Sequence, residues 1–225
     1  MKKFNIALDG PSGAGKSSVA DLLAAKYDMK HLDTGAMYRA LSWLLNREKI
    51  SLEDEKKLQE ALDKVVLDLP ADGRVIINGQ DVTSLIRTPE VSMLASRYAS
   101  SGLVRKKMVE LQQQITARKG FIVDGRDICD VVLPDAEVKI YLDASPEARA
   151  RRRYLQDLES GKQVSYEQVL SSICARDEQD RNRPVSPLTI SDQAVVVDSS
   201  DLSLDETVSA ISKIVSESLK KEGLL

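Results

Sequence analysis

The sequence contains few of the residues from which metal sites and disulfide frameworks are built. It has two cysteines, Cys129 and Cys174, and one histidine, His31. Because no Cys-x-x-Cys or His-Glu-x-x-His pattern occurs, a structural zinc site is excluded. A Cys129–Cys174 disulfide has nothing to support it, and two reduced thiols are expected of a cytoplasmic protein. His31 is far from any recognisable cluster of bases or metal ligands and is interpreted as a structural or surface residue.

Long apolar runs, aromatics and an excess of positive charge are also missing. No apolar run approaches the roughly 20 residues that cross a bilayer, and no secretory signal is recognisable. Aromatics make up 4% of the 225 residues, so the core is expected to be aliphatic. The net charge of -3 argues against a nucleic-acid-binding domain. With 42% hydrophobic residues, the chain is expected to be globular. A cytoplasmic protein is expected, and the acidic pI of about 5.4, with no evident exposed apolar stripe, favours a monomer.

Short apolar segments alternate with segments of helical periodicity. Buried strands are expected at residues 4–8, 29–32, 121–124, 138–142 and 194–197. Helices are expected at 16–27 and 36–46, from 146, from about 165, and at 204–220. Nearly continuous apolar strands joined by helices predict an α/β fold, with a five-stranded parallel sheet covered on both faces.

A different pattern occupies residues 65–83. Three short β-like runs are separated there by Asp72-Gly73 and Asn78-Gly79. Both dipeptides favour the positive φ angles of tight hairpin turns. The segment is therefore predicted to be a small inserted antiparallel meander.

The most specific motif runs from Gly10 to Ser17 and satisfies G-x-x-x-x-G-K-[ST] between an expected strand and an expected helix. Glycines permit the positive φ angles that turn backbone N–H groups inward, and the helix N-terminus adds partial positive charge. Lys16 can reach the phosphates, and the Ser17 hydroxyl can ligate Mg²⁺. A nucleoside triphosphate is expected to bind at Gly10, Pro11, Ser12, Gly13, Ala14, Gly15, Lys16, Ser17 and Ser18.

Arginine is concentrated late in the chain. Seven of the fifteen arginines lie within residues 149–183, namely Arg149, Arg151, Arg152, Arg153, Arg176, Arg181 and Arg183. Arginine suits bidentate phosphate recognition. Two helices joined near Ser160-Gly161 would form a lid that excludes water from the triphosphate. Because acidic residues are interspersed, a solvated, salt-bridged helix pair is the alternative.

Carboxylates follow two of the expected strands. Asp124 ends an apolar strand, which is where a phosphate-loop protein places an Asp associated with Mg²⁺, directly or through water. Arg126 could hold an acceptor phosphate, and Asp127 could accept hydrogen bonds from a base. A helix N-cap is the alternative for Asp124, and also for Asp33 ahead of the next helix.

Four segments taken in order resemble the bacterial cytidylate kinase family. They are residues 10–17, 33–39 (DTGAMYR), 124–127 (DGRD) and 176–183 (RDEQDRNR). The resemblance extends over about residues 4 to 215. It implies a phosphate-loop NTPase core with a monophosphate-binding domain and a helical lid. It also implies transfer of the γ-phosphoryl group of ATP, with Mg²⁺, to CMP or dCMP, giving ADP and CDP or dCDP.

The resemblance also assigns roles to single residues. Arg39, Arg126 and Arg183 match arginines that grip the acceptor phosphate. Ser96, Arg105 and Asp127 match positions that read cytosine, with Thr34 at the edge, and Arg176 and Asp180 match residues that hold the sugar. The expected catalytic groups are Lys16, Arg126, Arg149, Arg152, Arg153 and Arg183. Cys129-Asp130 departs from the Gly-Thr of the family, and the added carboxylate could weaken anion binding nearby.

The resemblance divides the chain into five parts. The core comprises residues 1–35, 119–145 and 187–225, the monophosphate-binding region residues 36–118 with its insert at about 60–90, and the lid region residues 146–186. Two other functions stay open: a small phosphate-loop kinase for a different acceptor, and a module that binds a nucleotide without catalysis. The density of arginines counts against the second, because binding alone needs fewer positive groups.

Overall fold

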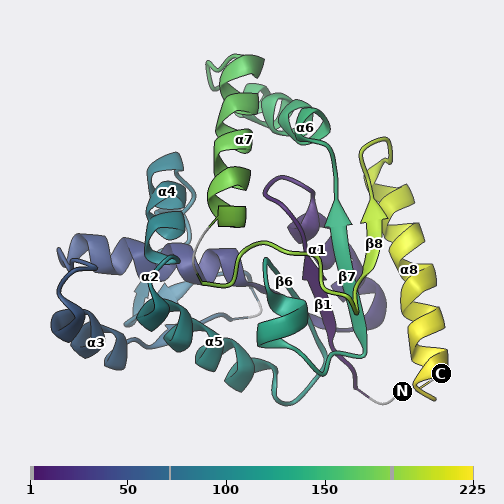
Figure 1. Ribbon diagram of the computed structural model, residues 1–225, viewed down its shortest axis with the longest axis horizontal. Helices are drawn as coiled ribbons and strands as arrows, with labels where there is room; N and C mark the ends of the chain where they lie inside the picture. The colour runs from purple at the N-terminus through teal and green to yellow at the C-terminus, as the bar shows by residue number, and fades with distance from the viewer. Residues whose placement is uncertain (1–2, 71, 183–184, 225) are drawn as a thin grey trace. The chain divides into compact units, whose positions relative to one another are not determined.

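The computed structural model describes residues 3–70, 72–182 and 185–224. The chain separates into two compact units (Figure 1). The first contains Met1–Leu32 and Arg118–Leu225, and the second contains Asp33–Ala117.

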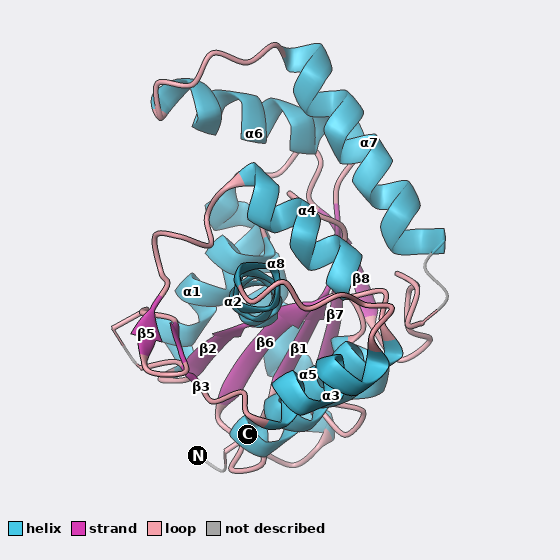
Figure 2. Cartoon of the chain, turned by 90° about the vertical axis from the view of Figure 1, so that its left-hand side faces the viewer, coloured by secondary structure: helices cyan, strands magenta, loops and turns pink. Residues whose placement is uncertain are grey.

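The first unit is built on a five-stranded sheet with the strand order β2-β6-β1-β7-β8 (Figure 2). Its strands are β1 (Ile6–Asp9), β2 (Lys30–Asp33), β6 (Phe121–Gly125), β7 (Val138–Asp143) and β8 (Val195–Asp198). The central strand β1 pairs in parallel with both β6 and β7, and β7 pairs in parallel with β8. Parallel pairing brings the carboxyl ends of β1, β6 and β7 to one edge of the sheet.

Aliphatic side chains join this sheet to two helices, α1 (Lys16–Tyr27) and α8 (Leu204–Lys221). The two helices and the inner strands share one buried cluster, which includes Ile6, Leu8, Leu23, Ile140, Ile211 and Val215. Ser203 begins α8 with a capping box formed with Glu206. The expected aliphatic core is confirmed.

Two further helices of this unit, α6 (Pro146–Glu159) and α7 (Tyr166–Asn182), pack against each other and are joined by residues 160–165 (Figure 1). Ser145 caps α6 by accepting a hydrogen bond from the backbone N–H of Ala148 at 3.1 Å. Ala150, Val169 and Ile173 bury the contact between the two helices. Both helices begin where the sequence predicts them.

The residues that the structure describes in the second unit form four helices, α2 (Thr34–Arg47), α3 (Glu55–Asp63), α4 (Pro89–Tyr98) and α5 (Gly102–Thr116). The unit also contains the predicted meander of β3 (Leu67–Asp68), β4 (Ile76–Ile77) and β5 (Gln80–Asp81), paired antiparallel. Asn78 and Gly79 have φ angles of 48° and 78°, as a type I′ turn requires. Helices α3, α4 and α5 were not among the expected elements.

The α/β class, the five-stranded parallel sheet and the small antiparallel sheet are therefore confirmed. Both cysteines are free, as expected. None of the helices in the described ranges is long and apolar enough to cross a membrane.

Candidate functional site

The phosphate loop joins β1 to α1 and has a backbone that only glycine can adopt easily. Gly10, Gly13 and Gly15 have φ angles of 147°, 80° and 90°. A Cβ atom on Gly10 would lie 2.0 Å from the carbonyl oxygen of Leu142 on the adjacent strand β7. Gly15 occupies the N-cap of α1 without a side-chain cap. The loop therefore presents the positive end of α1, which suits a phosphate group.

Lys16, the first residue of α1, is buried and folds back over this loop. Its ammonium group donates hydrogen bonds to the carbonyl oxygens of Gly10 and Pro11, both at 2.8 Å. Burial and the positive charge of Arg126 lower the pKa of Lys16 to about 7, although Asp124 opposes the shift. A phosphate group bound at the loop would stabilise the charged ammonium by replacing these neutral acceptors with anionic ones.

Asp124 lies at the end of β6, beside the first turn of α1. Its Oδ2 atom accepts a hydrogen bond from the Ser17 hydroxyl at 2.9 Å. Burial alone would raise the pKa of Asp124, but the hydrogen bond and charge of His31, with Lys16 and Ser17, hold it below its usual value. Asp124 is thus an ionised carboxylate in the strand and not a helix N-cap.

His31 on β2 lies beside Asp124, so the expectation that it is far from any cluster of bases or metal ligands was wrong. Its Nε2 atom lies 3.0 Å from Oδ1 of Asp124, and its Nδ1 atom lies 2.7 Å from Oδ1 of Asp21 on α1. Burial lowers the pKa of His31, but the two carboxylates outweigh it and raise the pKa to about 9. The sequence could not show this contact, because it does not reveal that β2 lies next to β6.

Ser17 and Asp124 are hard oxygen donors of the kind that Mg²⁺ prefers. In the described part of the chain, no group of three or more His, Cys, Asp or Glu side chains could hold a metal by itself. The donor set therefore fits a cation that takes few protein ligands and shares phosphate oxygens and water, as Mg²⁺ does with a nucleotide.

A buried carboxylate connects β1 to the segment that follows β6. Asp9 accepts hydrogen bonds from the backbone N–H groups of Ile128 and Cys129, both at 2.8 Å. Burial raises the pKa of Asp9. These bonds hold the start of η1 (Ile128–Val132), a π-helical turn directly after Asp127. Asp9 was not among the residues predicted from the sequence, although its place just before the phosphate loop was a usable signal.

The departure at Cys129-Asp130 is accommodated locally. Cys129 is buried, and its backbone N–H donates a hydrogen bond to Asp9. Asp130 accepts a hydrogen bond from the Ser191 hydroxyl at 2.6 Å. The added carboxylate is therefore engaged by a serine of the same unit.

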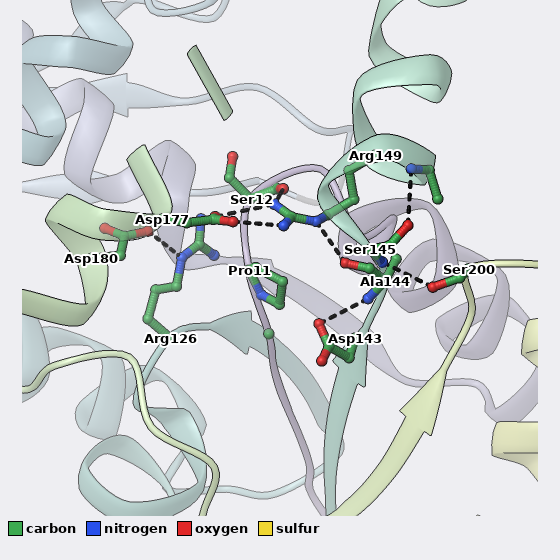
Figure 3. Close-up of polar contacts among 12 residues, drawn as sticks. Pro11, Ser12, Arg126, Asp143, Ala144, Ser145, Arg149, Asp177, Asp180 and Ser200 are labelled. Atoms are coloured by element: carbon green, nitrogen blue, oxygen red, sulfur yellow. Dashed lines mark hydrogen bonds and ion pairs between the residues drawn. The ribbon is translucent and has the colours of Figure 1, made fainter. Parts of the chain in front are cut away.

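Arg149 is buried at the centre of the contacts drawn in Figure 3. Its guanidinium donates to the carbonyl oxygen of Ala144 at 2.8 Å, to that of Ser12 in the phosphate loop at 2.9 Å, and to both carboxylate oxygens of Asp177 on α7 at 3.1 and 2.6 Å. Its Cβ atom also lies 3.4 Å from an ideal Cβ position on Gly13. One side chain thus links the loop, the end of β7 and α7.

Three other arginines of the first unit, Arg126, Arg152 and Arg153, also have protein partners. Arg126 donates through Nε to Asp180 on α7 at 2.8 Å (Figure 3). Arg152 donates to the carbonyl oxygens of Ser199 and Leu202, and Arg153 to Asp157 at 3.1 Å. The charge of Arg176 also contributes to the lowered pKa of Lys16, after burial and Arg126. Arg183 lies outside the described residues.

The predicted residues of the second unit are arranged around α2. Asp33 caps α2 through the N–H of Ala36 at 2.8 Å and accepts a hydrogen bond from Arg39 at 3.1 Å, so the capping interpretation of Asp33 is confirmed. Thr34 begins the helix and is buried. The guanidinium carbon of Arg105 lies 5.8 Å from the ring centroid of Tyr38. The hydroxyl of Ser96 donates to the carbonyl oxygen of Ser92 at 3.3 Å.

The structure therefore brings Lys16, Ser17 and Asp124 together at the carboxyl edge of the sheet, with Arg126 paired to Asp180 and Arg149 joined to the loop. Asp9, His31 and Asp177 are additional residues of this region. Asp177 belongs to the motif at residues 176–183, but nothing in the sequence indicated that it pairs with Arg149.

Comparison with known proteins identifies the family of this chain. The family model for cytidylate kinase matches residues 6–217. A cytidylate kinase of Caldicellulosiruptor bescii is 44% identical over 99% of this chain and 100% of its own length. A cytidylate kinase of Carboxydothermus hydrogenoformans is 46% identical over 94% of this chain and 97% of its own. A crystal structure from Eubacterium ventriosum shares the fold, with a TM-score of 0.54, 12% identity, and coverage of 95% of this chain and 99% of that one. The chain belongs to the cytidylate kinase family.

Proposed function

We propose that this protein transfers the γ-phosphoryl group of ATP to CMP or dCMP, with the release of ADP and CDP or dCDP. The observation that carries the proposal is the phosphate loop of β1 and α1 in a chain whose whole length matches cytidylate kinases. ATP and nucleoside monophosphates are cytoplasmic metabolites, and we expect the enzyme to work there, as a monomer and without a nucleic-acid partner.

Positioning and electrostatics account for the chemistry. The acceptor phosphate is already an anion at neutral pH, so the protein needs no strong general base. Lys16 and the N-terminus of α1 are proposed to stabilise the negative charge of the ATP phosphates. Ser17 would hold Mg²⁺, with Asp124 directly or through water, and the cation supplies charge neutralisation at the transferring group when bound.

The acceptor is proposed to bind through the residues that the resemblance assigns to it. In the second unit these are Thr34, Arg39, Ser96 and Arg105. In the first unit they are Arg126, Asp127, Arg176, Asp180 and Arg183. Arg126 and Asp180 bind each other in the structure, so both would exchange this contact for one with the acceptor.

The lid is proposed to be the region 146–186, and the monophosphate-binding region to be residues 36–118. Arg149, Arg152 and Arg153 belong to the lid and are proposed to act on the transferring group. Arg153 would have to move least of the three, because its side chain is already 48% exposed. A closed lid would exclude water, which competes as phosphoryl acceptor.

Asp127 is proposed to select cytosine. The N4 amino group of cytosine donates a hydrogen bond that a carboxylate accepts, whereas uracil presents an acceptor at that position. A site built for one pattern leaves polar groups unpaired with the other, which supports strong discrimination.

The test is ADP production from Mg·ATP with CMP, dCMP, UMP, AMP, GMP or no acceptor. We expect turnover with CMP and dCMP, and loss or broadening of this preference in Asp127→Asn. The matched control is Asp130→Asn, which removes the same charge three residues later from a side chain bound to Ser191. Turnover with another monophosphate would contradict the assignment of cytosine as the preferred base. ATP binding without turnover of any acceptor would contradict the proposed kinase activity.

A further inference from the structure

The single histidine of the chain occupies a place that the proposed mechanism does not use. His31 lies on β2 between two carboxylates, with Nε2 3.0 Å from Asp124 on β6 and Nδ1 2.7 Å from Asp21 on α1. The exposed fractions of the side chains are 13% for His31, 7% for Asp124 and 70% for Asp21. His31 therefore contacts one inward-facing and one outward-facing carboxylate.

The two oxygens of Asp124 are held from different elements. Oδ1 contacts His31 on β2, and Oδ2 accepts the hydroxyl of Ser17 on α1. A carboxylate held at both oxygens loses the freedom to rotate about its Cβ–Cγ bond. His31 in turn is oriented by Asp21, which fixes the plane of the imidazole. The chain Asp21–His31–Asp124–Ser17 thus ends at the first turn of the phosphate-loop helix.

We infer that His31 is a positioning residue that holds the Asp124 carboxylate beside Ser17 for the divalent cation that accompanies ATP. The inference rests on the proposed function only in that a metal–nucleotide complex binds at the loop. Groups that orient a metal-associated side chain change metal affinity by roughly 10- to 100-fold when they are removed. His31 is expected to act in this way on Asp124.

The first experiment measures binding of Mn²⁺·ADP, followed by the electron paramagnetic resonance signal of free Mn²⁺. His31→Phe keeps a ring of similar shape and removes both nitrogens, and it is expected to weaken binding about tenfold. The matched control is Asp21→Asn, whose amide oxygen can still accept the hydrogen bond from Nδ1 of His31 and so keeps the ring oriented. Loss of this exposed charge alone is expected to change affinity by less than about twofold. Unchanged affinity in a folded His31→Phe protein would overturn the inference.

Steady-state kinetics separate positioning from general damage. In His31→Phe the KM for Mg·ATP is expected to rise about tenfold while the KM for CMP stays constant. A loss of stability that merely loosens the protein would raise both. Equal changes in the two KM values would overturn the inference and leave the kinase activity itself intact.

A spectroscopic readout on the unaltered protein covers the case in which His31→Phe does not fold. A chain with one histidine gives one set of imidazole signals in the NMR spectrum. Mn²⁺·ADP is expected to broaden them, and Mg²⁺·ADP to shift them without broadening. Imidazole signals that stay sharp with Mn²⁺·ADP bound would overturn the inference. Because no acceptor is present, this outcome does not depend on whether the protein phosphorylates CMP.

Discussion

Arg149 on α6 and Asp177 on α7 form an ion pair at 2.6 Å in which the two side chains are 1% and 4% exposed. Removal of one partner leaves the other charge buried and uncompensated, which typically costs 3–5 kcal/mol. We expect Arg149→Met to lower the free energy of unfolding by about 3 kcal/mol. Urea unfolding followed by circular dichroism measures this loss.

The matched control is Arg153→Met on the same helix. Arg153 is half exposed and shares Asp157 with Lys162, so its removal leaves that carboxylate paired. We expect a cost below about 1 kcal/mol. Similar losses in the two variants would show that burial of the Arg149–Asp177 pair does not matter to stability.

Two glycines of the phosphate loop are expected to respond differently to alanine. Gly10→Ala would place a Cβ atom 2.0 Å from the carbonyl oxygen of Leu142, so we expect the β1–β7 contact to break and little folded protein to form. No atom lies within 4 Å of an ideal Cβ position on Gly15, so Gly15→Ala causes no clash. Its only expected effect is backbone strain at a φ angle of 90°, which would lower the free energy of unfolding by about 1–2 kcal/mol. Yield of folded protein and thermal unfolding distinguish the two.

The two thiols should differ in reactivity. Cys174 is exposed, whereas Cys129 is buried and its pKa is raised by burial and by the charge of Asp9. We expect one thiol to react with a disulfide reagent in the native protein and the second only after unfolding. Rapid reaction of two thiols in the folded protein would contradict the position of Cys129.

The surroundings of Glu137 lead us to expect that the free energy of unfolding depends on pH. Burial raises its pKa, but hydrogen bonds from Lys119 and from the backbone N–H of Asn5 outweigh burial and hold it below its usual 4.5. A carboxyl group with a lowered folded pKa adds stability above its unfolded pKa and loses it as the pH falls through the folded value.

We therefore expect Glu137→Gln to be less stable than the unaltered protein by about 1–2 kcal/mol at pH 7 and by much less near pH 3. Urea unfolding at both values measures the difference. A gap between the two proteins that stays constant over this range would show that the ionised carboxylate is not responsible.

Much of the first unit could be predicted because its signals are local. Buried apolar runs, the Gly-Lys-Ser loop and the Ser145-Pro146 cap each depend on a few consecutive residues, and the strands and helices lie where these signals place them. The turn at Asn78-Gly79 was predictable for the same reason. In the second unit α4 also carried a local signal, Thr88 followed by Pro89, which could have revealed it.

The unpredicted contacts join residues that are distant in the chain. The pairing of His31 with Asp124 depends on strand order, and the pairing of Arg149 with Asp177 depends on how two helices pack. Asp9 binds the backbone N–H groups of Ile128 and Cys129, and backbone donors leave no trace in a sequence. Local patterns identified residues capable of chemistry, whereas tertiary structure determines which of them meet.

The position of β1 at the centre of the sheet also affects how the protein is made. Ile6 pairs with Ile122 on one side and with Val138 on the other. A ribosome must therefore add more than half of the chain before β1 has either neighbour. Until then its apolar strand stays unpaired, and such a segment is a natural target for chaperones. The strand that leads into the phosphate loop thus waits for residues more than a hundred positions further along the chain before it reaches its final form.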